Sequence, residues 1–191
     1  DYNFDEMWAL DARMDSLGLP HHIAWFDGIH AWPGAADLTE AVEYMHLQAM
    51  QRGLLAPDLT WIDSLYRSRL RDAGMMRDAG ASYRAWRQFR AIEADFAGTH
   101  ELSAATAART ALEARTGVLE MERHMGELAR RQDRFNQKLG EVLGDLRESA
   151  PPFSAAWQRL GIDELLERSR DPVDTMGAHA ASRALEQMWV Y

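Results

Sequence analysis

His30 occupies a position in the sequence that is typical of a catalytic general base. His30 follows a short apolar run at 22–26 and the turn Asp27-Gly28, and a helix start follows at Asp37. A histidine on the loop that leaves a buried strand can act as a general base, because the ordinary pKa of imidazole lies near neutral pH. The sequence contains no Gly-x-Ser-x-Gly, so this base has no recognisable serine nucleophile to activate.

Three elements would position this histidine: a helix, a strand and a second helix. Apolar residues at helical spacing predict helices over 4–17 and 38–52, and the apolar run at 22–26 predicts a strand between them. A strand that is apolar on both faces belongs inside a sheet, where neighbouring strands bind its backbone groups. No second strand is evident in the sequence. We therefore interpret residues 1–56 as the last α-β-α unit of a larger α/β domain.

Residues 57–191 are predicted to be helical throughout. Their short connections favour antiparallel neighbours, as in helical-hairpin repeats. Gly80, Tyr83, Ala85 and Phe89 partly match a tetratricopeptide pattern. The sequence thus predicts a mainly α chain, with a tetratricopeptide-like helical extension after the α-β-α remnant. The expected helices cover 58–78, 82–96, 101–116 with a continuation to about 148, 154–160, 162–169, and 171 to the C-terminus.

Composition narrows the possible partners. The net charge of −9 argues against binding to a phosphate backbone, so no nucleic-acid partner is expected. The absence of cysteine excludes disulfides, thiol catalysis and thiolate metal sites. No apolar run approaches the ~18 residues that a membrane-spanning helix needs. The acidic charge is concentrated in residues 1–58, and the change in charge predicts a boundary near Pro57. No feature indicates a cellular location.

Three sequence stretches carry a resemblance to a known family. They are DYNFDEM at 1–7, GLPH at 18–21 and FDGIHAWP at 26–33. Together they resemble the C-terminal end of bacterial α/β-hydrolases of the dienelactone hydrolase and phospholipase/carboxylesterase kind. Residues 47–50 and 94–98, and the ending 171–190, resemble the helical extension that some of those proteins carry.

The resemblance implies a site and a function. His30 would be the catalytic base and Asp1 the triad acid of a carboxylic-ester hydrolase, with Asp5 as the alternative acid. Ile29 stands where family members commonly have a second glycine. The full-length protein would act on a small ester or acyl substrate, whereas this chain lacks the nucleophile and is expected to be inactive alone.

Other interpretations of these residues remain open. His30 could be a loop histidine that forms only local hydrogen bonds, and Asp1 could simply cap the following helix. The alternative function is a helical-repeat interaction module without catalysis, which would bind a protein partner on its helical region.

A metal site is the weakest of the chemical hypotheses. Glu43 and His46 form a Glu-x-x-His pair on one face of the predicted helix 38–52, and Glu120 and His124 form an i, i+4 pair. Di-iron bundles use two Glu-x-x-His motifs and further glutamates, but this sequence has one such motif. We therefore predict no metal and no cofactor.

Overall fold

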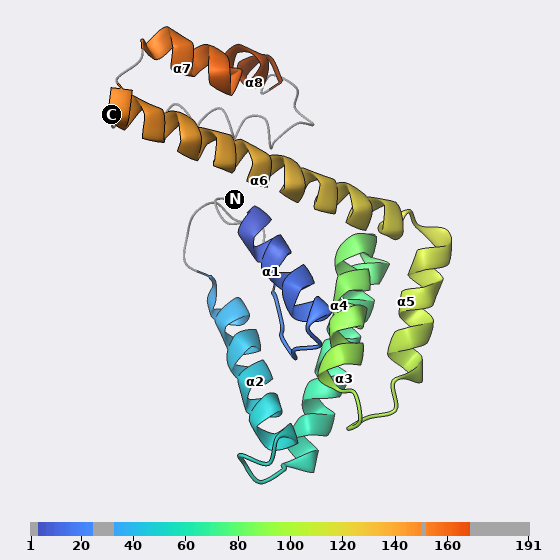
Figure 1. The fold of residues 1–191 in the computed structure, drawn as a ribbon. Coiled ribbons are helices and arrows are strands. Elements are labelled where there is room, and N and C mark those ends of the chain that lie inside the picture. Colours follow the sequence, from blue (N-terminus) through green and yellow to red (C-terminus); the bar gives the residue numbers. More distant parts are fainter. Residues whose placement is uncertain (1–3, 25–32, 150–151, 169–191) are drawn as a thin grey trace. The chain divides into compact units, whose positions relative to one another are not determined.

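The described part of the chain is built from helices. The structure is a computed structural model that describes residues 4–24, 33–149 and 152–168. No strand occurs in these ranges. The mainly α prediction is therefore confirmed (Figure 1). The helices are α1 (Phe4–Ser16), α2 (Ala35–Gln51), α3 (Leu59–Asp78), α4 (Ser82–Asp95), α5 (Ser103–Arg115), α6 (Val118–Ser149), α7 (Phe153–Leu160) and α8 (Ile162–Arg168).

The predicted α-β-α remnant is wrong. Residues 22–24, the described part of the expected strand at 22–26, have no regular secondary structure, and no strand elsewhere in the described ranges could pair with them. A short apolar run is ambiguous, because a connecting segment that packs against helices needs the same residues as a buried strand. The interpretation of this chain as a fragment of an α/β-hydrolase or esterase is also wrong, because that fold is organised around a sheet and the described residues contain no strand.

The chain divides into two compact units, each with its own core. One unit contains Asp11–His124, and the other contains Asp1–Leu10 and Met125–Tyr191. The core of the first unit joins residues before and after the predicted boundary near Pro57, because Leu47 and Met50 of α2 pack in the same cluster as Ile62 and Leu65 of α3. The most deeply buried large side chains of that cluster include Phe89, Ile92 and Phe96.

Helices α3, α4 and α5 lie side by side within the Asp11–His124 unit (Figure 1). The Asp58 carboxylate caps α3 by accepting a hydrogen bond from the Trp61 amide at 2.9 Å. Gly80, with φ +83°, lets the chain turn between α3 and α4. The expected continuation from 101–116 into one long helix is interrupted at Thr116-Gly117, so that α5 and α6 are separate helices.

The other unit packs α7 and α8 against the C-terminal part of α6 (Figure 1). Val142, Leu160 and Ile162 are central to this second core. Gly161 closes α7 in the left-handed conformation, with φ 65°, and α8 begins at the next residue. The helices expected at 154–160 and 162–169 are confirmed within a residue at each end, whereas the one expected from 171 lies outside the described residues.

Candidate docking surface

Helix α2 carries apolar side chains on the face that points to solvent. Leu38, Val42 and Met45 are 52%, 63% and 68% exposed, respectively. Their i, i+4, i+7 spacing places them in one stripe, because successive helical residues turn by about 100°. Leu47 is fully buried and lies about half a turn from Leu38, so α2 is apolar on its inner and its outer face. A helix that is apolar on both sides is typical of a buried helix.

An open hollow lies beside this stripe. It has a volume of about 370 Å³ and is lined by Leu38, Thr39, Val42, Glu43, His46 and Trp61. Its lining includes an aromatic pair, because the rings of His46 and Trp61 are in contact with their centroids 4.8 Å apart and their planes tilted by 39°. The hollow is mostly apolar and has a carboxylate at its edge, supplied by Glu43. This combination suits the side chain of a binding partner.

The outward face of α4 differs from that of α2 within the same unit. Its exposed positions include Arg84 and Arg90, as expected for the solvent side of an amphipathic helix. Met75 of α3 is 62% exposed. Its neighbours one turn away on either side, Arg71 and Asp78, are charged. Single exposed apolar residues are ordinary on protein surfaces, whereas a continuous stripe is typical of an interaction site. We define the α2 stripe as Leu38, Val42 and Met45.

A buried ionic cluster fixes α2 in its orientation. His22, whose side chain is 4% exposed, has Nε2 3.0 Å from Glu40 Oε1 and Nδ1 3.0 Å from Asp95 Oδ2. The latter contact is an ion pair without hydrogen-bond alignment. Arg69 donates from Nη1 to Asp95 Oδ2 at 2.7 Å and from Nη2 to the carbonyl of Glu40 at 3.3 Å. The cluster thus connects the segment after α1 with α2, α3 and α4.

The surroundings of His22 keep its imidazole charged. Burial alone would lower the pKa of His22, but the contacts with Asp95 and Glu40 outweigh it and raise the pKa to about 9. The hydrogen bond from His22 in turn lowers the pKa of Glu40. The ring also stacks on Tyr44, with centroids 5.2 Å apart. A protonated, enclosed imidazole cannot accept a proton, so this histidine serves structure rather than general-base catalysis.

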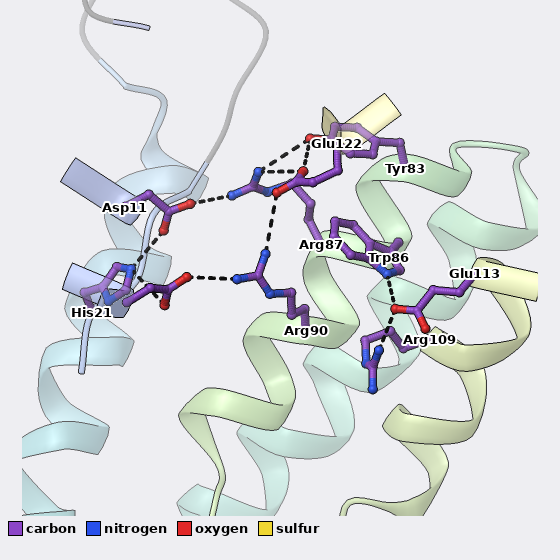
Figure 2. Close-up of polar contacts among 10 residues, drawn as sticks. Asp11, His21, Tyr83, Trp86, Arg87, Arg90, Arg109, Glu113 and Glu122 are labelled. Atoms are coloured by element: carbon purple, nitrogen blue, oxygen red, sulfur yellow. Dashed lines mark hydrogen bonds and ion pairs between the residues drawn. The ribbon is translucent and has the colours of Figure 1, made fainter. Parts of the chain in front are cut away.

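A second polar network lies on α4 (Figure 2). Arg87 donates to Asp11 at 2.8 Å and to Glu122 at 3.3 Å, while Arg90 pairs with Asp15 at 2.9 Å. The network joins the C-terminal end of α1 and the start of α6 to α4. Because these pairs are partly exposed, each contributes about 1 kcal/mol or less.

Tyr83 and His21 complete this network (Figure 2). The Tyr83 hydroxyl donates to Glu122 at 2.5 Å, and burial followed by this hydrogen bond raises its pKa to about 12. His21 places Nε2 2.8 Å from Asp11 Oδ1 and Nδ1 2.9 Å from the carbonyl of Leu19. Both ring nitrogens of His21 therefore face acceptors. Burial lowers the pKa of His21, but the contacts with Leu19 and Asp11 outweigh burial and raise the pKa. This histidine also serves a structural role, because both of its ring nitrogens are held by contacts within the unit.

The sequence-predicted catalytic residues are not brought together by the described structure. His30 and Asp1 lie outside the described residues, so their assignments stay predictions without structural support. The alternative acid, Asp5, is buried and accepts a hydrogen bond from the amide of Asn136 at 2.8 Å. It therefore helps to hold the first turns of α1 against α6 within their unit.

The Glu-x-x-His spacing is reproduced, but without a metal-binding set. Glu43 and His46 do share a face of α2, since both line the hollow. Across residues 4–24, 33–149 and 152–168, no group of three or more histidine, cysteine, aspartate or glutamate side chains has the arrangement to hold a metal ion. The imidazole of His46 contacts the ring of Trp61 instead, in a tilted arrangement.

Comparison with known proteins yields no relative. No protein-family model matches the chain, and neither a curated protein nor a solved structure is significantly similar to it. The resemblance to bacterial α/β-hydrolases therefore has no support from sequence comparison, in agreement with the absence of strands from the described ranges. None of the described helices has both the length and the apolar character to cross a membrane.

Proposed function

We propose that this chain is a helical protein-interaction module whose docking surface is the α2 stripe and the adjoining hollow. The observation that carries the proposal is the exposed apolar stripe on a helix whose opposite face is already buried. Covering the outer face of such a helix with a second apolar surface is favourable, because it removes apolar side chains from water. The proposal needs no catalytic group.

The expected gain can be worked out from the exposed side chains. Fully burying an aliphatic side chain is favourable by about 1.5–3 kcal/mol, and the three stripe residues are half to two-thirds exposed. Covering them would therefore contribute about 1 kcal/mol each, or about 3–4 kcal/mol together. A gain of this size corresponds by itself to a dissociation constant of about 1 mM or weaker, so the proposed docking also needs contacts in the hollow beside Trp61.

The ionic cluster supports the same proposal, because a docking surface must be held rigidly. Glu40 is paired with His22 and lies on the inner side of α2, while the backbone carbonyl of Glu40 is bonded by Arg69. Leu47 and Met50 fix the same side of the helix in the core. Helix α2 cannot roll to bury its stripe without breaking these contacts.

A matched pair of variants tests the function. Met45→Asp places a charge in the stripe, and Met75→Asp places the same charge at a nearly equal exposure on α3, outside it. The probe is a synthetic helical peptide with leucines at i, i+3, i+4 and i+7 and glutamines elsewhere. Its affinity would be measured by fluorescence anisotropy. We expect Met45→Asp to weaken binding by at least about tenfold, equivalent to 1.4 kcal/mol, and Met75→Asp to leave it unchanged.

Two results would contradict the proposal. One is equal affinity of both variants for the peptide, which would place binding elsewhere. The other is no detectable binding to the unsubstituted chain at millimolar peptide. Circular dichroism of both variants supplies the folding control, since each substitution lies on a solvent-exposed position.

A further inference from the structure

The charge around the α2 stripe is one-sided. Helix α2 has no lysine or arginine, and the carboxylates that flank its stripe are Asp37 and Glu43, since Glu40 lies on the inner side with His22. Over residues 33–63 the chain has five carboxylates and one arginine. An apolar stripe with an acidic border differs from the mixed-charge surface that keeps helices soluble without selecting a partner.

The internal cations do not neutralise this border. His22 and Arg69 are the two cations of the buried cluster, and both contact Asp95. The cluster also includes Glu40, 3.0 Å from His22, and Glu43, 3.8 Å from Arg69. Three carboxylates thus face two cations. Glu43 is about a third exposed and lines the hollow, so its charge is presented to a docked group.

We infer that the partner is a basic amphipathic helix, with apolar side chains that cover the α2 stripe and lysine or arginine side chains that face the acidic border. This inference rests on the proposed docking function. The stripe spans two helical turns. Apolar residues at this spacing are the ones that make contact when one amphipathic helix packs against another. The polar positions of the partner helix should then be basic, because like charges across an interface oppose association.

The same charge disfavours two other occupants. A second copy of the chain would oppose one acidic border to another in a two-fold contact. An anionic membrane surface attracts basic amphipathic helices and would repel the carboxylates of α2. A basic helix from a protein is the occupant for which both the apolar and the charged parts of the surface are complementary.

Three peptides with one leucine stripe and different polar faces test the inference. The polar face is lysine, glutamine or glutamate, and binding to the full chain is measured at low and at high salt. We expect the lysine peptide to bind at least about tenfold more tightly than the glutamate peptide at low salt, with the ratio falling at about 1 M salt, where the screening length is about 3 Å. Glu43→Gln should reduce the preference for lysine, whereas Glu120→Gln, on the exposed start of α6, should not.

The outcomes separate the inference from the function on which it rests. If all three peptides bind equally, and Met45→Asp weakens all of them, the basic partner is excluded while the docking surface stands. If no peptide binds, both proposals fail. Sedimentation that shows a dimer dissociated by Met45→Asp would identify a second copy as the occupant. Binding to phosphatidylserine vesicles that Met45→Asp abolishes would identify a membrane instead. Either of these last two results overturns the inference.

Discussion

The buried imidazole of His22 predicts a specific loss of stability at alkaline pH. Its pKa is raised to about 9 in the folded chain, against 6.5 for the unperturbed group. A raised pKa means that the folded state binds the proton more tightly, so the stabilisation is complete below about pH 6.5 and is lost as the pH rises through about 9. The raised pKa contributes about 3 kcal/mol to the free energy of unfolding at low pH. About 2.5 kcal/mol of this contribution is lost between pH 7 and pH 10.

A double difference isolates this effect from other titrating groups. Urea unfolding of the unsubstituted chain and of His22→Gln would be followed by far-ultraviolet circular dichroism and tryptophan fluorescence between pH 7 and pH 10. We expect the free-energy difference between the two proteins to shrink by about 2.5 kcal/mol over this range. Titration of tyrosines and of the chain terminus affects both proteins and cancels. Parallel stability curves across the whole range would refute the reasoning, since the imidazole would then carry no bound proton to lose.

Three further predictions follow from individual contacts. Asp95→Asn removes the carboxylate that faces both His22 and Arg69, and should destabilise the Asp11–His124 unit by about 3–5 kcal/mol in urea unfolding, because two buried cations lose their partner. Gly161→Ala should cost about 1 kcal/mol, read as a lower thermal midpoint, because φ 65° is strained for any residue with a β-carbon. In an ultraviolet titration one tyrosine, Tyr83, should ionise near pH 12, and Glu122→Gln should bring its pKa down, because the carboxylate that disfavours the phenolate is then uncharged. A Tyr83 titration unchanged by that substitution would show that burial alone sets its pKa.

The helices were predictable from the sequence to within a few residues. Periodicity located α3, α4, α7 and α8, because their apolar stripes face cores that form largely among neighbouring helices. Gly80 and Pro152 marked breaks correctly because glycine and proline act locally on the backbone. The interruption at Thr116-Gly117 was missed, since apolar residues keep a helical period on both sides of it.

The expected strand failed for a different reason. Residues 22–24 are held by contacts distant in the sequence, and His22 reaches Glu40 and Asp95. Local composition cannot distinguish an extended segment anchored on helices from a strand that pairs in a sheet. The ionic cluster itself could not be found from spacing, because the contacts of His22 and Arg69 with Glu40 join residues 18 and 29 positions apart along the chain.

The α2 stripe can be recognised in the sequence. Leu38, Val42 and Met45 fall at helical spacing opposite Leu47, so α2 is apolar around much of its circumference. Which of the two faces would be buried could be decided only by the packing of α2 on α3 and α4. The structure resolves this, because Leu47 and Met50 enter the core and the stripe does not.

Mapping by nuclear magnetic resonance tests the proposed docking surface most directly. Titration of the isotopically labelled chain with the lysine–leucine peptide should shift the backbone amide signals of 38–46 and the indole signal of Trp61, and should leave those of α5 unchanged. The same titration on Met45→Asp should produce small shifts or none. Shifts centred on another helix, or shifts of equal size in the variant, would contradict the assignment of α2 as the docking surface.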